Sequence, residues 1–157
     1  MEVTTKRGLA LATGEGLKLQ SGPGRDLIFK VTGDETDGAF DFFTVDVAPK
    51  SGPPLHVHHV QEEAIFVLKG RFKVRVGDEI FHCDEGGFAY MPKQMPHAFF
   101  NLTEEDGRII VVYTPGGGHR FYEEFGPVAR SGADRAALAG VFTKHDMTLL
   151  GPPMTAD

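Results

Sequence analysis

Two closely spaced histidines are the strongest candidates for metal ligands in this chain. His56 and His58 lie in the stretch GPPLHVHHVQEEAIFVLKG, residues 52–70. In an extended strand, residues two positions apart project from the same face, about 7 Å from each other. The two imidazoles are therefore expected to converge on one metal ion.

Further candidate metal ligands occur both close to the histidine pair and far downstream of it. Glu62 and Glu63 come four and five residues after His58, and His97 lies far downstream in MPHAFFN. Three imidazoles and one carboxylate suit a divalent first-row transition metal, namely Fe, Mn, Co, Ni, Cu or Zn, and such a set leaves coordination positions open at the larger coordination numbers. The sequence does not choose the metal, and the residues alone leave Glu62 and Glu63 as alternatives.

The other histidines are expected to lie outside this site. His59 falls on the opposite face of the strand from His58. His82, His119 and His145 lack a paired spacing, and we expect them to be in contact with solvent.

Short alternating segments dominate the chain around these residues and predict an all-β fold. The 157 residues suit one domain, and the 20 Gly and 10 Pro indicate many turns. Turn signals at 77–78, 84–87 and 92–96 separate short apolar runs. Along residues 71–76, apolar residues alternate with Arg71, Lys73 and Arg75, so the basic side chains are expected to point to solvent. This pattern is typical of a β-sandwich or barrel.

The two ends of the chain differ from its middle. Residues 1–20 predict a loose N-terminal arm with one short strand, and residues 21–118 hold the strands. Residues 119–157 form a tail in which apolar residues recur at helical spacing, which predicts two short helices packed outside the barrel. The closing GPPMTAD is expected to fray unless it is docked.

Composition excludes several classes of partner. The net charge of −6 repels a phosphate backbone, so no nucleic acid is expected to bind. The longest purely apolar runs are far shorter than the roughly 20 residues that span a bilayer, which predicts no membrane helix. The N-terminus lacks the apolar region of a secretory signal, and a lone Cys83 cannot form an internal disulfide. These features predict a cytoplasmic protein.

The spacing of the candidate ligands resembles the two motifs of the cupin superfamily. The first motif is matched by His56-x-His58-x4-Glu63-x6-Gly70. The second is matched by Gly86-x5-Pro92 and His97-x3-Asn101. Two loop positions depart from the pattern, since the first motif's early glycine sits at Gly52 and Gln94 replaces the second motif's middle glycine.

This resemblance carries expectations about fold and activity. It implies a small antiparallel β-barrel of jelly-roll type, with a metal held by His56, His58, Glu63 and His97. The spacing to Gly70 favours Glu63 over Glu62. The helical tail is similar to that of single-domain cupins that resemble quercetin dioxygenases. Such enzymes insert O2 into an enolic aromatic substrate, a scheme in which Glu63 is both ligand and catalytic base, and cupins commonly form homodimers.

An apolar pocket is expected beside the metal, lined by side chains that share the inward face of their strands. The predicted lining residues are Phe43, Val45, Ile65, Phe72, Val74, Val76, Phe99, Val111 and Tyr113. A flat, oxygen-bearing small molecule suits such a pocket. The leading hypothesis is a metal-dependent dioxygenase of a flavonol-like substrate; the alternatives are a metal-dependent isomerase or epimerase and a non-catalytic small-molecule-binding cupin.

Overall fold

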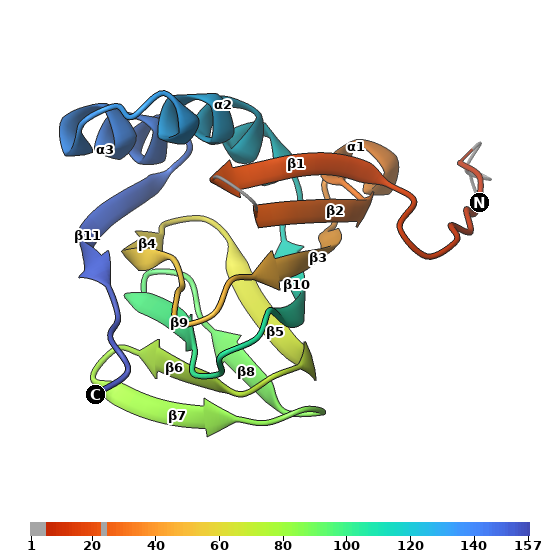
Figure 1. Ribbon diagram of the computed structural model, residues 1–157. Helices are drawn as coiled ribbons and strands as arrows, with labels where there is room; N and C mark the ends of the chain where they lie inside the picture. The colour runs from red at the N-terminus through yellow and green to blue at the C-terminus, as the bar shows by residue number, and fades with distance from the viewer. Residues whose placement is uncertain (1–5, 23–24) are drawn as a thin grey trace.

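The structure is a computed structural model that describes residues 6–22 and 25–157. Two antiparallel sheets face each other in a jelly roll, which confirms the predicted all-β cupin-type fold (Figure 1). The six-stranded sheet contains, in spatial order, β1 (Leu17–Gly22), β2 (Arg25–Val31), β3 (Asp41–Val47), β10 (Gly107–Thr114), β5 (Glu62–Lys69) and β8 (Phe88–Met91). The five-stranded sheet contains β11 (Met147–Pro153), β4 (Pro54–His58), β9 (His97–Asn101), β6 (Phe72–Val76) and β7 (Glu79–Cys83). The described strands do not close into one continuous barrel.

Alternating burial along the strands builds the core between the sheets. In β3 every second residue is buried, and Phe43 stacks on Phe29 of β2 with ring centroids 4.2 Å apart. Phe72, Ile65 and Ile109 are also almost fully buried in this core. The apolar face of each strand therefore fills the space between the sheets, as the sequence pattern predicts.

The described residues also form three helices: α1 (Gly33–Thr36), α2 (His119–Arg130) and α3 (Arg135–Lys144). Figure 1 shows α2 and α3 side by side at one end of the sheets, with β7 at the opposite end. The two predicted C-terminal helices are thus confirmed, and Phe121, Phe142 and Met147 form a second apolar cluster beneath them. None of the helices in the described ranges is long and apolar enough to cross a membrane.

The tail beyond the helices is docked, which is the condition under which the closing segment was not expected to fray. Residues 147–153 form β11, which pairs with β4 at the edge of the five-stranded sheet. Proline is tolerated at an edge, where one side of the strand needs no ladder hydrogen bonds, so the two prolines in this segment concealed the strand. At the other end of the chain, β1 is the short strand of the predicted arm, while residues 1–5 of that arm lie outside the described residues.

Lys73 also differs from expectation. Its side chain points away from the core, as predicted from alternation, but the residue is only 7% exposed. The docked tail covers it, and its ammonium group donates hydrogen bonds to the carbonyl oxygens of Thr155 and Asp157. Strand parity therefore predicts the side of the sheet correctly but cannot reveal that a distant segment covers that side.

Candidate metal centre

Four buried side chains converge where the two sheets meet. One ligand atom from each of His56, His58, Glu63 and His97 lies within 4.8 Å of every other. The centroids of the His56 and His97 imidazole rings are 4.5 Å apart, and those of His58 and His97 are 5.2 Å apart. The structure thus brings together all four residues that the sequence singled out as ligands.

Three strands position these side chains. His56 and His58 share one face of β4, and His56 pairs directly with His97 on the neighbouring β9. Glu63 reaches the cluster from β5 in the facing sheet. Gly52 lets the chain enter β4 in close contact with β9, because a Cβ atom at this position would lie 1.8 Å from the carbonyl oxygen of Phe99.

Backbone carbonyl groups orient two of the imidazoles. His56 Nδ1 lies 2.7 Å from the carbonyl oxygen of Pro54, and His97 Nδ1 lies 3.0 Å from that of Met95. A carbonyl oxygen only accepts hydrogen bonds, so each Nδ1 carries the proton that it donates. The Nε2 atom of each ring is thereby directed at the cluster, as in metal-binding histidines.

His58 provides the clearest test of whether the cluster fits a metal ion. Its Nδ1 lies 3.4 Å from Gln61 Oε1, and its Nε2 is fully buried with no hydrogen-bond partner among the described residues. That Nε2 lies 3.4 Å from Glu63 Oε2 without forming a hydrogen bond. Burying an unpartnered nitrogen costs about 1–3 kcal/mol. A bound cation would satisfy this lone pair, so the donor set fits a transition metal.

Burial and mutual charge shift the pKa values of this cluster. Burial alone would raise the pKa of Glu63, but the positive charge and hydrogen bond of His97, at 2.8 Å, lower it to about 2. Burial would lower the pKa of His97, and the Glu63 carboxylate raises it above its usual value. Burial and the neighbouring imidazoles lower the pKa of His56 to about 3. The Glu63 carboxylate and a protonated His97 therefore stabilise each other, with the proton held between them.

Metal binding should consequently weaken as the pH falls. A metal ion must displace the proton that His97 carries, and the raised pKa of His97 means that this proton is held more tightly than on a free imidazole. Affinity for Zn²⁺ is expected to fall as pH decreases from 8 to 6, by about tenfold for each pH unit below the pKa of His97. Competition titrations with a chelator at several pH values measure this, and a flat profile would contradict the shared proton.

Gln61 is expected to support metal binding through His58. Replacing it with Leu removes the only described partner of His58 Nδ1 and should weaken Zn²⁺ binding about tenfold. The matched control is Gln94→Leu, because Gln94 Oε1 instead contacts His59, at 2.9 Å. Equal Zn²⁺ affinities of the two variants would show that the Gln61 contact does not orient the ligand.

Two neighbouring residues that could have served as ligands direct their side chains away from the cluster. Glu62 points away and accepts hydrogen bonds from the Tyr90 hydroxyl, at 2.9 Å, and from the Lys93 backbone, at 2.7 Å. His59 contacts Gln94 and, at 2.8 Å, Thr148 Oγ1. Gln94 has a φ of 66°, the left-handed conformation that the motif's glycine normally supplies.

Two of the histidines expected in solvent are in fact covered. His119 is 4% exposed, because its ring packs edge-on against Phe29, with centroids 6.1 Å apart, and its Nε2 lies 3.3 Å from Asp34. His145 is half-buried against Phe121. Both positions become covered where the helices pack on the sheets, which spacing along the chain does not show. His82 is exposed as expected.

An apolar cavity of about 130 Å³ adjoins the cluster, with His56, His58 and Glu63 in its wall. Five of the predicted pocket residues line it, namely Phe43, Val45, Phe99, Val111 and Tyr113. Four do not line the cavity: Ile65, Phe72 and Val74 lie in the core, and Val76 is partly buried against it. These four share the inward face of their strands. Alternation predicts on which face a side chain lies, but it does not predict how close that side chain is to the metal cluster.

The other wall of this cavity comes from the C-terminal part of the chain, which the sequence reasoning assigned to outer packing. The lining residues from this part are Phe121, Tyr122, Phe125, Phe142 and Met147. The helical spacing of the first three did indicate an apolar face on 119–130. The spacing could not indicate that this face closes over the metal ligands.

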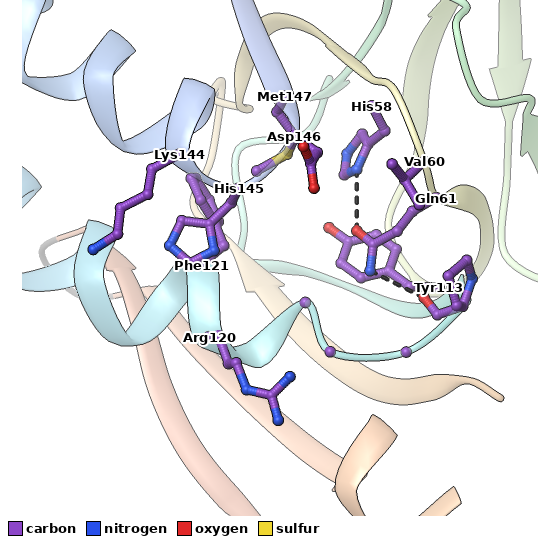
Figure 2. Close-up of a pocket in the computed structure, with 14 residues that line it drawn as sticks. His58, Val60, Gln61, Tyr113, Arg120, Phe121, Lys144, His145, Asp146 and Met147 are labelled. Carbon is purple, nitrogen blue, oxygen red and sulfur yellow. Dashed lines mark hydrogen bonds between the residues drawn. The ribbon is translucent and has the colours of Figure 1, made fainter. Parts of the chain in front are cut away.

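A second, more polar cavity of about 230 Å³ also has His58 in its wall (Figure 2). It shares His58, Tyr113, Phe121 and Met147 with the apolar cavity. In Figure 2, Gln61 lies between His58 and the glycine-rich loop before α2. The metal cluster is therefore bordered by two adjoining cavities of different polarity.

Comparisons with known proteins agree with this geometry. Residues 43–113 match the family described as Cupin domain. The chain is 37% identical over 57 residues to an uncharacterised protein of Streptomyces coelicolor and 30% identical over 61 residues to one of Methanocaldococcus jannaschii. These matches span 36% and 39% of this chain and 53% and 49% of the relatives, so the chain covers about half the length of the curated relatives it matches.

Solved structures show the same fold at low sequence identity. KdgF from Halomonas sp. superposes with a TM-score of 0.64 at 18% identity, over 73% of this chain and 99% of that one. An RmlC-like cupin from Shewanella frigidimarina gives 0.62 at 14% identity, over 74% and 99% of the two chains. A predicted oxalate decarboxylase from Thermotoga maritima gives 0.60 at 15% identity, over 68% and 99%. Residues 43–113 thus match a cupin domain, and the chain shares its fold with these cupin structures.

Proposed function

We propose that this protein is a metal-dependent dioxygenase that acts on a small aromatic or enolic substrate and resembles quercetin dioxygenases. The observation that carries the proposal is a buried cluster of three imidazoles and one carboxylate in the wall of an apolar, aromatic-lined cavity. Metal sites with open coordination positions beside an apolar cavity are suited to small molecules that bind through an oxygen atom.

The size of the cavity narrows the substrate class. Sites for drug-sized ligands measure about 300–1,000 Å³, and the apolar cavity is about 130 Å³. A small enol or a single-ring phenol therefore suits the apolar cavity alone. A larger flavonol would also need the adjoining cavity of about 230 Å³.

Different residues of the chain would have different roles in such a reaction. A bound transition metal would supply Lewis acidity and an open position for oxygen chemistry. Glu63, held ionised by its neighbours, accepts the hydroxyl proton of the enol. Phe43, Phe99 and Phe142 surround the substrate with apolar surface and exclude water from the reacting atoms.

Oxygen uptake tests this function directly. The protein is loaded separately with Fe(II), Mn(II), Co(II) and Ni(II) and supplied with flavonols, catechols and acetylacetone. Uptake that depends on metal and substrate, and that a His97→Ala variant lacks, is expected. Uptake no greater than that of His97→Ala with every metal would overturn the proposal for these substrates.

An isomerase or epimerase is the second candidate, because Glu63 and His97 form an acid–base pair with 2.8 Å between their atoms. A structure described as a sugar phosphate isomerase from Silicibacter pomeroyi shares the fold, with a TM-score of 0.51 and 23% identity. Such an activity would convert hexose or pentose phosphates without oxygen, as followed by NMR under anaerobic conditions. A protein that binds metal but shows neither activity would be a ligand-binding cupin.

We also propose that the protein is a homodimer. Phe66, Leu68, Phe88 and Tyr90 are each at least 41% exposed, and all four lie on the neighbouring strands β5 and β8 at one edge of the six-stranded sheet. An exposed apolar sheet edge favours association with another copy. Light scattering at micromolar concentration is expected to give twice the chain mass, with Phe88→Lys shifting the protein towards monomer; monomeric wild type would contradict the proposal.

A further inference from the structure

A pair of tyrosine hydroxyl groups lies in the cavity beside the candidate metal ligands. Tyr113 comes from β10 and Tyr122 from α2, and their hydroxyl oxygens are 3.1 Å apart. Both residues line the apolar cavity that also contains His56, His58 and Glu63. Two consecutive elements, β10 and α2, therefore bring two hydroxyl groups together in a largely apolar cavity.

One O–H donor of this tyrosine pair has no acceptor among the described residues. Each phenol has one O–H donor, so one tyrosine donates to the other and the second O–H remains available. Within residues 6–22 and 25–157, the two hydroxyls have no partner other than each other. A buried donor is normally paired, because leaving it unpaired costs free energy. The pair therefore offers one hydrogen bond to whatever occupies the cavity.

The position of the pair relates this donor to the metal cluster. Tyr113 is the direct cross-strand partner of Glu63, and its ring centroid lies 5.2 Å from that of His58. Figure 2 shows the Tyr113 ring beside His58 and Gln61, and both Tyr113 and His58 line the two cavities. A ligand bound through one oxygen at the cluster would thus have the hydroxyl pair close to its adjacent atoms.

Packing holds both rings in place. Phe43 contacts both tyrosines, with ring centroids 5.0 Å from Tyr113 and 6.1 Å from Tyr122. Phe121 packs edge-on against Tyr122 at 5.0 Å. Gly118 admits the Tyr113 ring, because a Cβ atom at residue 118 would lie 2.4 Å from it. The donor is therefore preorganised and needs little reorganisation to meet a ligand.

We propose that the Tyr113–Tyr122 pair donates a hydrogen bond to a second oxygen of the ligand and selects molecules with two neighbouring oxygens, such as the enolates of 1,3-diketones or α-hydroxyenones. This inference rests on the proposed function, because it assumes a ligand that binds the metal through oxygen. The tyrosines are specificity-determining residues that contact the ligand, while Glu63 accepts its proton.

Binding of two probes to the Co(II)-loaded protein tests this selection without turnover. Acetylacetone offers two oxygens, whereas imidazole binds cobalt through nitrogen and offers no acceptor oxygen. Both are titrated anaerobically, and the visible spectrum of cobalt reports binding. The double variant Tyr113→Phe/Tyr122→Phe is expected to bind acetylacetone about three- to tenfold more weakly than wild type, with imidazole affinity changed less than twofold.

Single variants make the test robust to folding defects. Whichever of Tyr113→Phe and Tyr122→Phe removes the hydroxyl facing the ligand should reproduce most of the effect, and cobalt content with thermal unfolding verifies each fold. Unchanged acetylacetone affinity in all three variants, or an equal loss for both probes, would overturn the inference, as would an absence of cobalt binding. Selective loss of acetylacetone binding without oxygen uptake by the wild type would retain the inference and reject the dioxygenase.

Discussion

The His97→Ala variant is expected to bind Zn²⁺ or Co²⁺ more than about 100-fold more weakly than wild type, with complete loss of any metal-dependent activity. Substitution of groups that merely orient a metal ligand already costs about 10–100-fold in affinity. His97 supplies a ligand atom itself, and its Nε2 lies 2.8 Å from Glu63 Oε2. Removing it also deprives the buried Glu63 carboxylate of the positive neighbour that lowers its pKa.

The matched control is His59→Ala. His59 also contacts its surroundings through both ring nitrogens, but its partners are Gln94 and Thr148 and not the metal cluster. Metal content of freshly purified protein and chelator competition measure both variants. A His97→Ala protein that is folded and retains the metal affinity of His59→Ala would contradict the assignment of the metal centre.

Strand geometry predicted that His56 and His58 lie together, whereas Glu63 and His97 lie on two other strands and were assigned from residue type and motif spacing. Side chains alternate strictly along a strand, so His56 and His58 had to share a face. The choice of Glu63 over Glu62 depended on motif spacing, and the structure places the Glu63 carboxylate with the imidazoles. Positions on one strand are related by geometry that requires no knowledge of the remaining chain.

The cavity could be predicted only in part, because its shape depends on how distant segments pack. Val74 and Phe99 both face inward from paired positions, yet only Phe99 lines the cavity. Tyr122 and Phe142 close the chamber from the helices, and nothing in their spacing specifies which surface they cover. The His56–His58 pair follows from the geometry of one strand, whereas the convergence of β4, β5 and β9 on one site and the shape of the cavity both depend on the assembled fold.

Asp41 illustrates a residue whose importance the sequence concealed. It begins β3 and is 0% exposed. Its carboxylate accepts hydrogen bonds from the backbone N–H groups of Gly33, at 2.7 Å, Gly117, at 2.8 Å, and Gly118, at 2.7 Å. One side chain thus connects α1, the glycine-rich loop and the start of α2. Because α2 carries Tyr122, this connection also positions one wall of the cavity.

The Asp41→Ala variant is therefore expected to lose about 3–5 kcal/mol of the free energy of unfolding. It leaves three backbone donors without their acceptor, and unpaired buried groups cost about 1–3 kcal/mol each before local relaxation. The carboxylate also lies at the N-terminus of α2, where the helix dipole favours negative charge. Urea denaturation, with slopes compared between variants, measures the loss.

Asp46→Ala on the same strand provides the control. Asp46 forms an exposed ion pair with Arg108, at 2.7 Å, and such pairs contribute at most about 1 kcal/mol. Similar unfolding free energies for the two variants would show that the Asp41 hydrogen bonds are readily replaced by water. A large loss confined to Asp41→Ala would establish that the loop before α2 is held by one carboxylate, and that the helical wall of the cavity depends on a residue outside the metal cluster.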